Sequence, residues 1–219
     1  MKVDEDTLPK LLRSNYLKYG DRKVSFRDKD YGIWQRYSWR DLYDRVKHSS
    51  LALISLGLQP GDKVAILGET KPEAHIAEFA TQAVQAMPFG VFADCTPPEI
   101  EYFLTHSDAK FIFAHDQEQV DKVLLIKDKI PRVKKVIYWD PKGLWFYRDP
   151  MLMSFEQALE LGRDYEASHP SLFEQNIERG KGEDIAVLLY TSGTTGLPKA
   201  AMLSYRNLFY PLAAAIDYF

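Results

Sequence analysis

The feature that most constrains the fold is an alternation of short apolar runs with helical segments through the middle of the chain. The apolar runs predict strands at 63–67, 87–93, 110–114 and 135–138. The segments between them predict helices at 72–86, 97–106 and 118–129. Strands that alternate with helices in this way indicate βαβ units, whose strands lie parallel. The sequence therefore predicts an α/β fold, with a mostly parallel sheet flanked by helices.

Segments on either side of this alternation carry helix-start and helix-stop signals. Ser38 and Ser154 each open a capping-box pattern, in which an acidic or amide side chain follows three residues later. Gly57 and Gly162 are predicted to end these two helices, and the charged stretch 164–182 is predicted to be a surface connector. Further predicted elements are a helix at 8–19, a hairpin at 24–37 and a helix that begins with Ser204 as its N-cap.

The composition is that of a soluble globular protein with one large or two small domains. Of its 219 residues, 46% are hydrophobic and 27% are charged. With 28 basic and 31 acidic residues, the net charge of −3 provides no basic field for nucleic acid or anionic lipid. The single cysteine, Cys95, excludes an intramolecular disulfide, fits a reducing compartment and is predicted to be a packing residue. Because we find no signal peptide and no run of about 18 apolar residues, we expect a cytoplasmic protein, with peripheral membrane contact if its substrate is a lipid.

The strongest chemical signal is a loop rich in glycine and hydroxyl side chains that follows an aliphatic run. The run, 185–189, predicts a strand buried on both faces. In a parallel sheet such a loop lies beyond the carboxyl end of its strand, where ligands bind. Glycine allows close approach to the backbone, and successive N–H groups form a concave anion site. The hydroxyls of Ser192, Thr194 and Thr195 add donors and Lys199 adds positive charge, so we expect a polyphosphate ligand.

The segment Tyr190-Thr-Ser-Gly-Thr-Thr-Gly-Leu-Pro-Lys199 resembles, residue for residue, the signature phosphate loop of the adenylate-forming enzymes. These enzymes include acyl-CoA synthetases, luciferases and the adenylation domains of peptide synthetases. The segment is not the P-loop of kinases, which needs G-x-x-x-x-G-K-[ST]. Residues 38–113 are also similar to the N-terminal region of acyl-CoA synthetases, especially the long-chain fatty-acid branch. Ala200 stands where the family commonly has glycine, and Tyr205 stands where it often has histidine.

The resemblance implies an ATP-dependent acid–thiol ligase. In that family a carboxylate attacks the α-phosphorus of Mg-ATP to give an acyl-adenylate and pyrophosphate, and coenzyme A then displaces AMP. The expected substrates are therefore ATP, a fatty acid (a long chain is favoured) and coenzyme A, with Mg²⁺ as the metal ion. By the same resemblance, the phosphate cradle consists of Ser192, Gly193, Thr194, Thr195 and Gly196. Lys199 is expected to neutralise charge on the β- and γ-phosphates, and the hydroxyl of Thr191 to help hold Mg²⁺.

Members of the family are much longer than this chain. We therefore expect residues 1–219 to form an incomplete N-terminal AMP-binding domain that ends just after the phosphate loop, with the C-terminal domain absent. In the family the C-terminal domain supplies a lysine that assists adenylation, so no residue of this chain is assigned a catalytic role. The chain alone is expected to be inactive, and the apolar surface left uncovered favours a homodimer.

Other interpretations stay open at this point. An adenylating enzyme with another acceptor, either luciferase-like or loading a carrier protein, would carry the same loop. A P-loop kinase and a non-catalytic nucleotide-binding module are alternatives outside that class. The five histidines lack metal-ligand spacing, so a zinc site is not expected, and His75 is interpreted as a core or interface residue. The aromatic cluster 144–147 is interpreted as core or connector packing.

Overall fold

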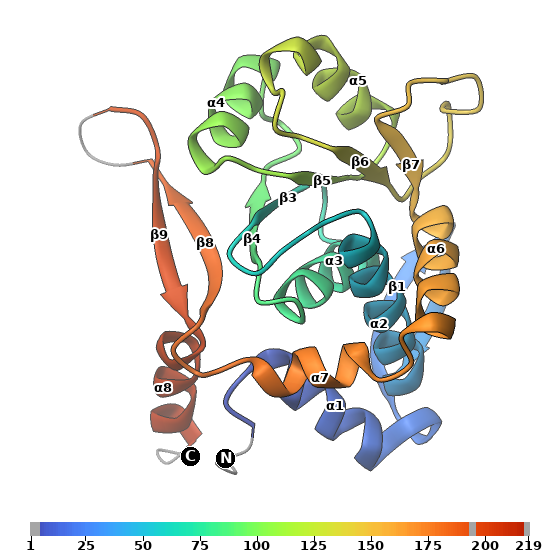
Figure 1. The fold of residues 1–219 in the computed structure, drawn as a ribbon, viewed down its shortest axis with the longest axis vertical. Coiled ribbons are helices and arrows are strands. Elements are labelled where there is room, and N and C mark those ends of the chain that lie inside the picture. Colours follow the sequence, from blue (N-terminus) through green and yellow to red (C-terminus); the bar gives the residue numbers. More distant parts are fainter. Residues whose placement is uncertain (1–4, 193–195, 217–219) are drawn as a thin grey trace.

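The fold is built on a parallel sheet of five strands in the order β4-β3-β5-β6-β7 (Figure 1). The computed structural model describes residues 5–192 and 196–216. The strands are β3 (Lys63–Leu67), β4 (Met87–Val91), β5 (Phe111–Ala114), β6 (Lys135–Tyr138) and β7 (Leu152–Ser154). All four neighbouring pairs run parallel, which confirms the predicted sheet.

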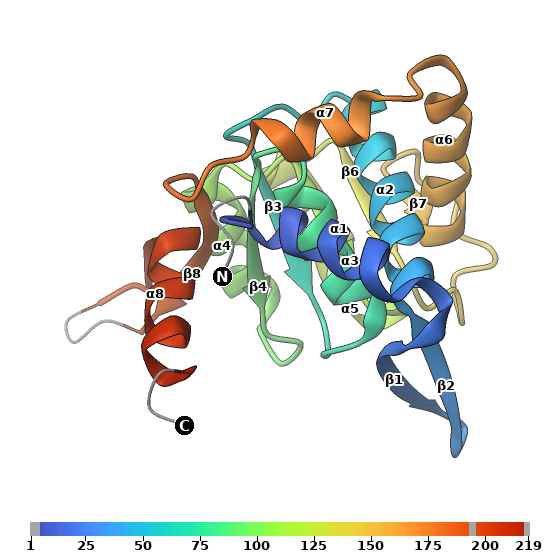
Figure 2. The ribbon, with the colours of Figure 1, turned by 90° about the horizontal axis from the view of Figure 1, so that it is seen from below.

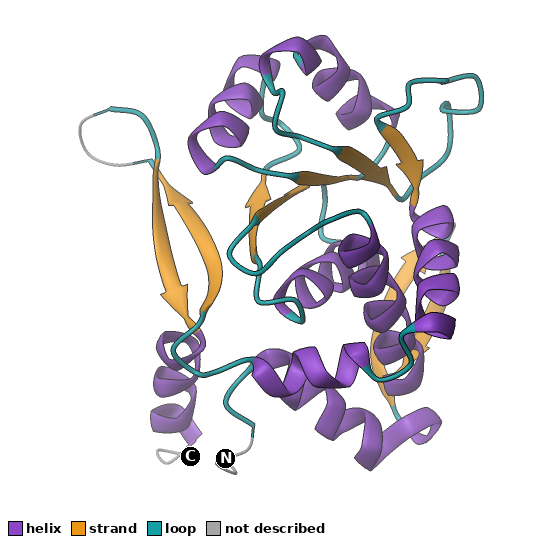
Figure 3. Ribbon diagram, in the orientation of Figure 1, coloured by secondary structure: helices purple, strands orange, loops and turns teal. Residues whose placement is uncertain are grey.

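Helices cover both faces of this sheet (Figures 1 and 3). The helices α4 (Pro97–Ser107) and α5 (Gln117–Leu125) lie on one face, and α2 (Trp39–Ser55) and α3 (Pro72–Gln82) lie on the other. The central strand β5 contributes side chains to the cores on both faces of the sheet, because successive side chains of a strand point to opposite faces. Phe111 and Phe113 join the core on the α2 and α3 side, whereas Ile112 joins the core on the α4 and α5 side.

The amino-terminal segment follows the sequence prediction closely. It consists of α1 (Leu8–Tyr19), the short 3₁₀ helix η1 (Gly20–Arg22), and an antiparallel hairpin of β1 (Val24–Asp30) and β2 (Ile33–Ser38). The predicted capping box at the start of α2 is present: Ser38 Oγ accepts the N–H of Asp41 at 3.0 Å, and the Asp41 carboxylate accepts the N–H of Ser38 at 2.8 Å. Gly57, with φ 89°, follows the end of α2 as expected. A second 3₁₀ helix, η2 (Lys127–Lys129), follows α5.

The helix α6 (Phe155–Ser168) corrects the prediction that Gly162 ends it. Its capping box, formed by Ser154 and Gln157, is present as predicted. The helix then continues through Gly162, because the glycine serves the packing of α6 against α2 and not the helix end. A Cβ at this position would lie 1.8 Å from the carbonyl oxygen of His48 in α2. Only glycine allows the two helix backbones to come this close.

The stretch 164–182 is more than a surface connector, so that prediction was wrong. It contains the last turn of α6 and a further helix, α7 (Leu172–Arg179). Phe173 and Ile177 of α7 are 2% and 1% exposed, and they enter the core shared with α1 and α2. Their spacing of four residues places them on one face of a short helix whose other face is charged.

The last part of the described chain is a second hairpin followed by a helix. The strands β8 (Ile185–Thr191) and β9 (Lys199–Ser204) pair antiparallel as a separate sheet, and α8 (Tyr205–Ile216) follows. The hairpin stands beside β4, on the opposite side of the molecule from β1 and β2 (Figures 1 and 2). None of the helices in the described ranges is long and apolar enough to cross a membrane.

The hairpin corrects the prediction that 185–189 is buried on both faces within the parallel sheet. Ala186 and Leu188 are buried, but Leu189 is 46% exposed. One face of β8 packs on the body of the protein and the other stays open, so an aliphatic run of this length is compatible with a half-buried strand. The glycine-rich loop is therefore the tip of a hairpin, outside the five-stranded sheet to which the carboxyl-end rule applies.

Candidate functional site

The register of the β8–β9 hairpin brings the two ends of the glycine-rich loop together. Thr191, the last residue of β8, and Lys199, the first of β9, are direct partners across the hairpin. Side chains of directly opposite residues project from the same face of an antiparallel pair. Both residues are exposed. A hydroxyl and an ammonium group thus stand side by side at the mouth of the loop.

The loop between these two residues carries the remaining predicted phosphate ligands. Ser192 and Gly196 are exposed. Gly196 has a φ of 153°, a backbone conformation that glycine adopts readily and other residues rarely adopt. Gly193, Thr194 and Thr195 lie outside the described residues. The structure thus places Thr191, Ser192, Gly196 and Lys199 at one exposed tip, and their roles in binding stay predictions.

Helix α4 contacts both ends of this loop. The hydroxyl of Tyr102 donates a hydrogen bond to the carbonyl oxygen of Pro198 at 2.7 Å. A second hydrogen bond, of 2.9 Å, joins Nδ1 of His106 and the hydroxyl of Tyr190. The ring of Tyr190 also packs edge-on against Phe103, with 4.8 Å between the ring centroids. Burial raises the pKa of the Tyr190 hydroxyl, so it stays protonated near neutral pH.

Sequence reasoning missed the contribution of α4. The sequence predicted no role for Tyr102, and it treated His106 only as one of five histidines without metal-ligand spacing. The contacts join residues that are 96 and 84 positions apart in the chain. No local pattern identifies such a pair, because the contact depends on how the hairpin docks beside β4.

The base of the hairpin is fixed by a different set of contacts. The side-chain amide of Gln82 in α3 donates to the carbonyl oxygen of Ala186 at 2.9 Å. Ala186 also packs with Tyr205 and Phe209 of α8. Ser204 caps α8 as predicted, since its hydroxyl accepts the N–H of Asn207 at 3.3 Å. The hairpin is thus held at its base by α3 and α8, and near its tip by α4.

Two positions depart from the pattern of the adenylate-forming enzymes, and the structure shows where they lie. Ala200 sits in regular strand β9 opposite Tyr190, and it is not one of the described non-glycine residues with positive φ. Alanine is therefore accommodated there without backbone strain. Tyr205 is 3% exposed and belongs to the core beneath the hairpin.

The described residues at the exposed tip carry hydroxyl groups and a positive charge. Thr191 and Ser192 offer hydroxyl oxygens and Lys199 offers a positive charge, which together fit a polyphosphate. Within 5–192 and 196–216, no group of three His, Cys, Asp or Glu residues could hold a metal ion. Mg²⁺ commonly binds through phosphate oxygens and few protein ligands. The predicted role of the Thr191 hydroxyl in holding Mg²⁺ stays a prediction.

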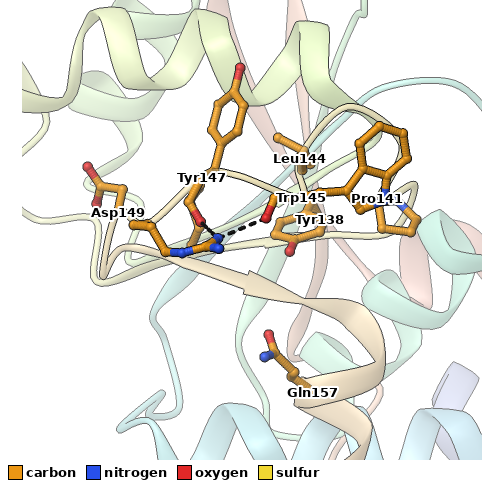
Figure 4. Close-up of a pocket in the computed structure, with 9 residues that line it drawn as sticks. Tyr138, Pro141, Leu144, Trp145, Tyr147, Asp149 and Gln157 are labelled. Carbon is orange, nitrogen blue, oxygen red and sulfur yellow. Dashed lines mark hydrogen bonds between the residues drawn. The ribbon is translucent and has the colours of Figure 1, made fainter.

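Other features noted in the sequence lie away from the loop. His75 is exposed, so it is not a core residue, and the alternative that it lies at an interface stays a prediction. The cluster 144–147 is only partly packed, since Leu144 is buried but Trp145 and Phe146 are 66% and 84% exposed. Cys95 is a buried free cysteine, as expected for a packing residue. A surface cavity of about 330 Å³ is lined in part by this cluster, and none of the described phosphate-loop residues lines it. Figure 4 shows the residues around this cavity.

The fold and the sequence of the loop define an α/β protein with a glycine- and hydroxyl-rich loop at the tip of a hairpin. More narrowly, the chain belongs to the AMP-binding enzyme family, because the model of that family matches residues 13–218. This agrees with the resemblance of residues 190–199 to the phosphate loop of adenylate-forming enzymes.

Curated relatives of the chain are named long-chain-fatty-acid–CoA ligases. The chain is 29% identical to one from Xenopus laevis, over 95% of this chain and 28% of the relative. It is 29% identical to one from Homo sapiens, over 96% of this chain and 30% of the relative. The ligase heimdall of Drosophila melanogaster is 27% identical, over 97% of this chain and 32% of the relative. The chain therefore spans less than a third of the length of these proteins.

The fold also matches a solved structure of a CoA ligase. The crystal structure of the anthranilate CoA ligase AuaEII in complex with anthranoyl-AMP gives a TM-score of 0.72. It covers 98% of this chain and 37% of that chain, at 21% sequence identity. At this identity the match confirms the α/β fold of the chain.

Proposed function

We propose that this chain serves in an AMP-forming acid–thiol ligase, in which the loop 191–199 holds the β- and γ-phosphates of ATP. The enzyme would join a fatty acid, with a long chain favoured, to coenzyme A and release AMP and pyrophosphate. Support for the acid and the thiol comes from the names of the curated relatives. Mg²⁺, bound with ATP, would neutralise part of the phosphate charge.

The observation that carries the proposal is the pairing of Thr191 with Lys199 across an exposed hairpin tip. The loop between them resembles the phosphate loop of the adenylate-forming enzymes, and the chain belongs to the AMP-binding enzyme family. A polyphosphate seated at this tip would meet backbone N–H groups and hydroxyls along the loop and the Lys199 ammonium at its end. Such interactions position a phosphate chain and neutralise its charge, which is most of what phosphoryl-transfer chemistry needs from a protein.

Binding of MgATP to the 219-residue chain tests the phosphate site directly. Lys199→Ala is expected to weaken MgATP binding about 10-fold or more, because a charge-assisted contact to phosphate is lost. The circular dichroism spectrum should stay unchanged, since Lys199 is exposed. Lys181→Ala is the matched control, because Lys181 is an exposed lysine before the opposite end of β8. Equal MgATP affinity of the Lys199→Ala variant and the wild-type chain would contradict the proposal.

Exchange of pyrophosphate into ATP tests the reaction. The 219-residue chain is expected to show no palmitate-dependent exchange, and a longer polypeptide that contains residues 1–219 is expected to show it. Thioester formation with coenzyme A then separates a CoA ligase from an adenylating enzyme with another acceptor. MgATP binding without acid-dependent exchange in the longer polypeptide would favour a non-catalytic nucleotide-binding module.

Location and assembly form part of the same proposal. We place the protein in the cytoplasm, with peripheral membrane contact during use of a lipid substrate, and as a homodimer. Cell fractionation and light scattering of the purified chain test these points separately from the binding assay.

A further inference from the structure

We propose that Tyr102 and His106 of α4 are positioning residues that hold the two ends of the phosphate loop at a fixed spacing and direction. This inference rests on the proposed function, because it assigns a purpose to the geometry of the same loop. Neither residue reaches the phosphates in this proposal. Each acts through a residue that is next in the chain to a predicted phosphate-binding residue. Tyr102 acts through Pro198, which precedes Lys199, and His106 acts through Tyr190, which precedes Thr191.

The contact of Tyr102 fixes the end of the loop that carries the lysine. Its hydroxyl donates to the carbonyl oxygen of Pro198 at 2.7 Å. That carbonyl and the amide nitrogen of Lys199 belong to one planar peptide unit. The hydrogen bond therefore fixes the orientation of the peptide unit to which the Cα of Lys199 belongs, and with it the direction of the Lys199 side chain. Because the ring of Tyr102 is itself half-buried on α4, the bond connects Lys199 to a rigid element.

The contact of His106 fixes the other end of the loop. Its Nδ1 lies 2.9 Å from the hydroxyl of Tyr190, the residue directly before Thr191. The ring of Tyr190 is further held between Phe103 and Phe89 of β4, with centroids 4.8 Å and 5.6 Å away. Tyr190 therefore cannot rotate without breaking both a hydrogen bond and aromatic packing.

The two contacts act as one unit because Tyr102 and His106 lie one helical turn apart. Residues at this spacing share a face of the helix, and their rings stack with 5.3 Å between centroids. The helix that carries them is well fixed. Thr96 and Glu99 form its capping box, and Ile100 and Leu104 are 1% and 3% exposed in the core.

Support of the two ends of a ligand-binding loop lowers the free energy that ordering costs on binding. Glycine-rich backbone is free to adopt many conformations, and ordering it on ligand binding costs free energy. Contacts that order the two ends before the ligand arrives reduce this cost and so raise affinity. We therefore expect the α4 contacts to appear in two measurements: the opening rate of the free loop and the affinity for a polyphosphate.

Two tyrosine-to-phenylalanine variants test the proposal with little disturbance of packing. Tyr102→Phe removes the bond to Pro198, and Tyr190→Phe removes the bond to His106, while each ring is kept. Each variant is expected to speed amide hydrogen exchange at residues 191–199 about 2- to 10-fold, the effect of one lost hydrogen bond on local opening. Inorganic tripolyphosphate should bind the 219-residue chain about 2- to 10-fold more weakly. The thermal unfolding midpoint should change little.

Tyr147→Phe is the matched control. Its hydroxyl donates to Asp121 at 2.6 Å and accepts from Gln117 at 3.0 Å, so the same chemical group is lost from hydrogen bonds before β7, at the opposite edge of the sheet from β4 and the hairpin (Figure 1). This variant is expected to leave both the exchange of 191–199 and tripolyphosphate affinity unchanged. Equal effects from Tyr147→Phe would show a global loosening and would overturn the proposal.

The outcomes for this inference and for the proposed function are distinct. If wild-type protein binds no tripolyphosphate but both test variants still speed exchange at 191–199, α4 positions the loop and the phosphate-binding function fails. If wild-type protein binds tripolyphosphate and neither test variant changes exchange or affinity, the function stands and the positioning role is wrong. If one test variant fails to fold, the other still measures its own end of the loop.

Discussion

At the scale of single residues, the same amino acid serves different purposes that the sequence alone does not separate. Gly57 and Gly162 both follow a capped, amphipathic helical segment, so both were predicted to end a helix. Gly57 does so with a φ of 89°. Gly162 lies inside α6, where the absence of a side chain lets α6 approach α2. The difference lies in tertiary packing, which a local pattern does not contain.

Gly162→Ala is therefore expected to destabilise the protein by about 1–3 kcal/mol, the usual cost of overpacking. In an isolated helix the same change would stabilise by about 1 kcal/mol. The added Cβ would lie 1.8 Å from a backbone oxygen of His48, so either α2 or α6 must move. Urea unfolding followed by circular dichroism measures the change.

Gly90→Ala is the matched control for this prediction. Gly90 lies in β4, and a Cβ there would meet nothing within 4 Å. The free energy of unfolding of the Gly90→Ala variant is expected to differ from that of the wild-type chain by less than about 0.5 kcal/mol. A Gly162→Ala variant at least as stable as the wild-type chain would contradict the role assigned to this glycine.

At the scale of elements, the sequence predicts what local chemistry decides. The strands β3 and β6 begin and end at the predicted residues, because each is a short apolar run bounded by polar turns. The helices α2 and α6 start where their capping boxes predict. The three-residue strand β7 was missed, since so short a run carries no periodic signal.

The same distinction between local chemistry and tertiary contacts applies to the candidate site. The loop 191–199 was predicted to bind phosphate from its own residues. The structure pairs Thr191 with Lys199 at an exposed tip, and their roles in binding stay predictions. Its place in a separate antiparallel hairpin and its contacts with Tyr102 and His106 were not predicted. These features depend on pairing and docking between segments far apart in the chain.

The capping box of α6 provides a prediction at this scale. Ser154→Ala removes the hydroxyl that accepts the N–H of Gln157 at 3.2 Å, so it is expected to cost about 1 kcal/mol of stability. Ser168→Ala, at the exposed opposite end of α6, should cost less than about 0.5 kcal/mol. The midpoints of urea unfolding of the two variants compare the effects of the two substitutions. Equal midpoints would argue against a stabilising role of the Ser154 cap.

At the scale of the whole molecule, the contact between α3 and the last hairpin joins the βαβ core to the part that carries the loop. Gln82 is 2% exposed and bonds to β8, and Glu78 lies one turn earlier on the same face of α3. Tyr205 of α8 is buried nearby, and its pKa is raised first by burial and further by the negative charges of Asp184 and Glu78. A partly buried carboxyl group therefore sits at the junction of the two parts.

Burial raises the pKa of the Glu78 carboxyl in the folded protein, and the positive charge of His75, when protonated, opposes this only in part. The folded state thus favours the protonated carboxyl more than the unfolded state does. The stability linked to Glu78 is fully present below the unfolded pKa and is lost as the pH rises through the folded pKa. Above the unfolded pKa, folding must therefore either take up a proton at this carboxyl or bury its charge at the base of the hairpin.

Glu78→Gln keeps the shape of the side chain and removes this charge. The variant is expected to match the wild-type chain at pH 4 and to exceed its free energy of unfolding increasingly as the pH rises to 8. Urea unfolding at a series of pH values measures the difference between the two proteins, so that other titrating groups cancel. Glu69→Gln, at an exposed position before α3, is the control and should show no such divergence. If the Glu78→Gln difference stays constant with rising pH, folding does not raise the pKa of Glu78, and if it shrinks, the charged carboxylate stabilises the junction. Either result would contradict the prediction.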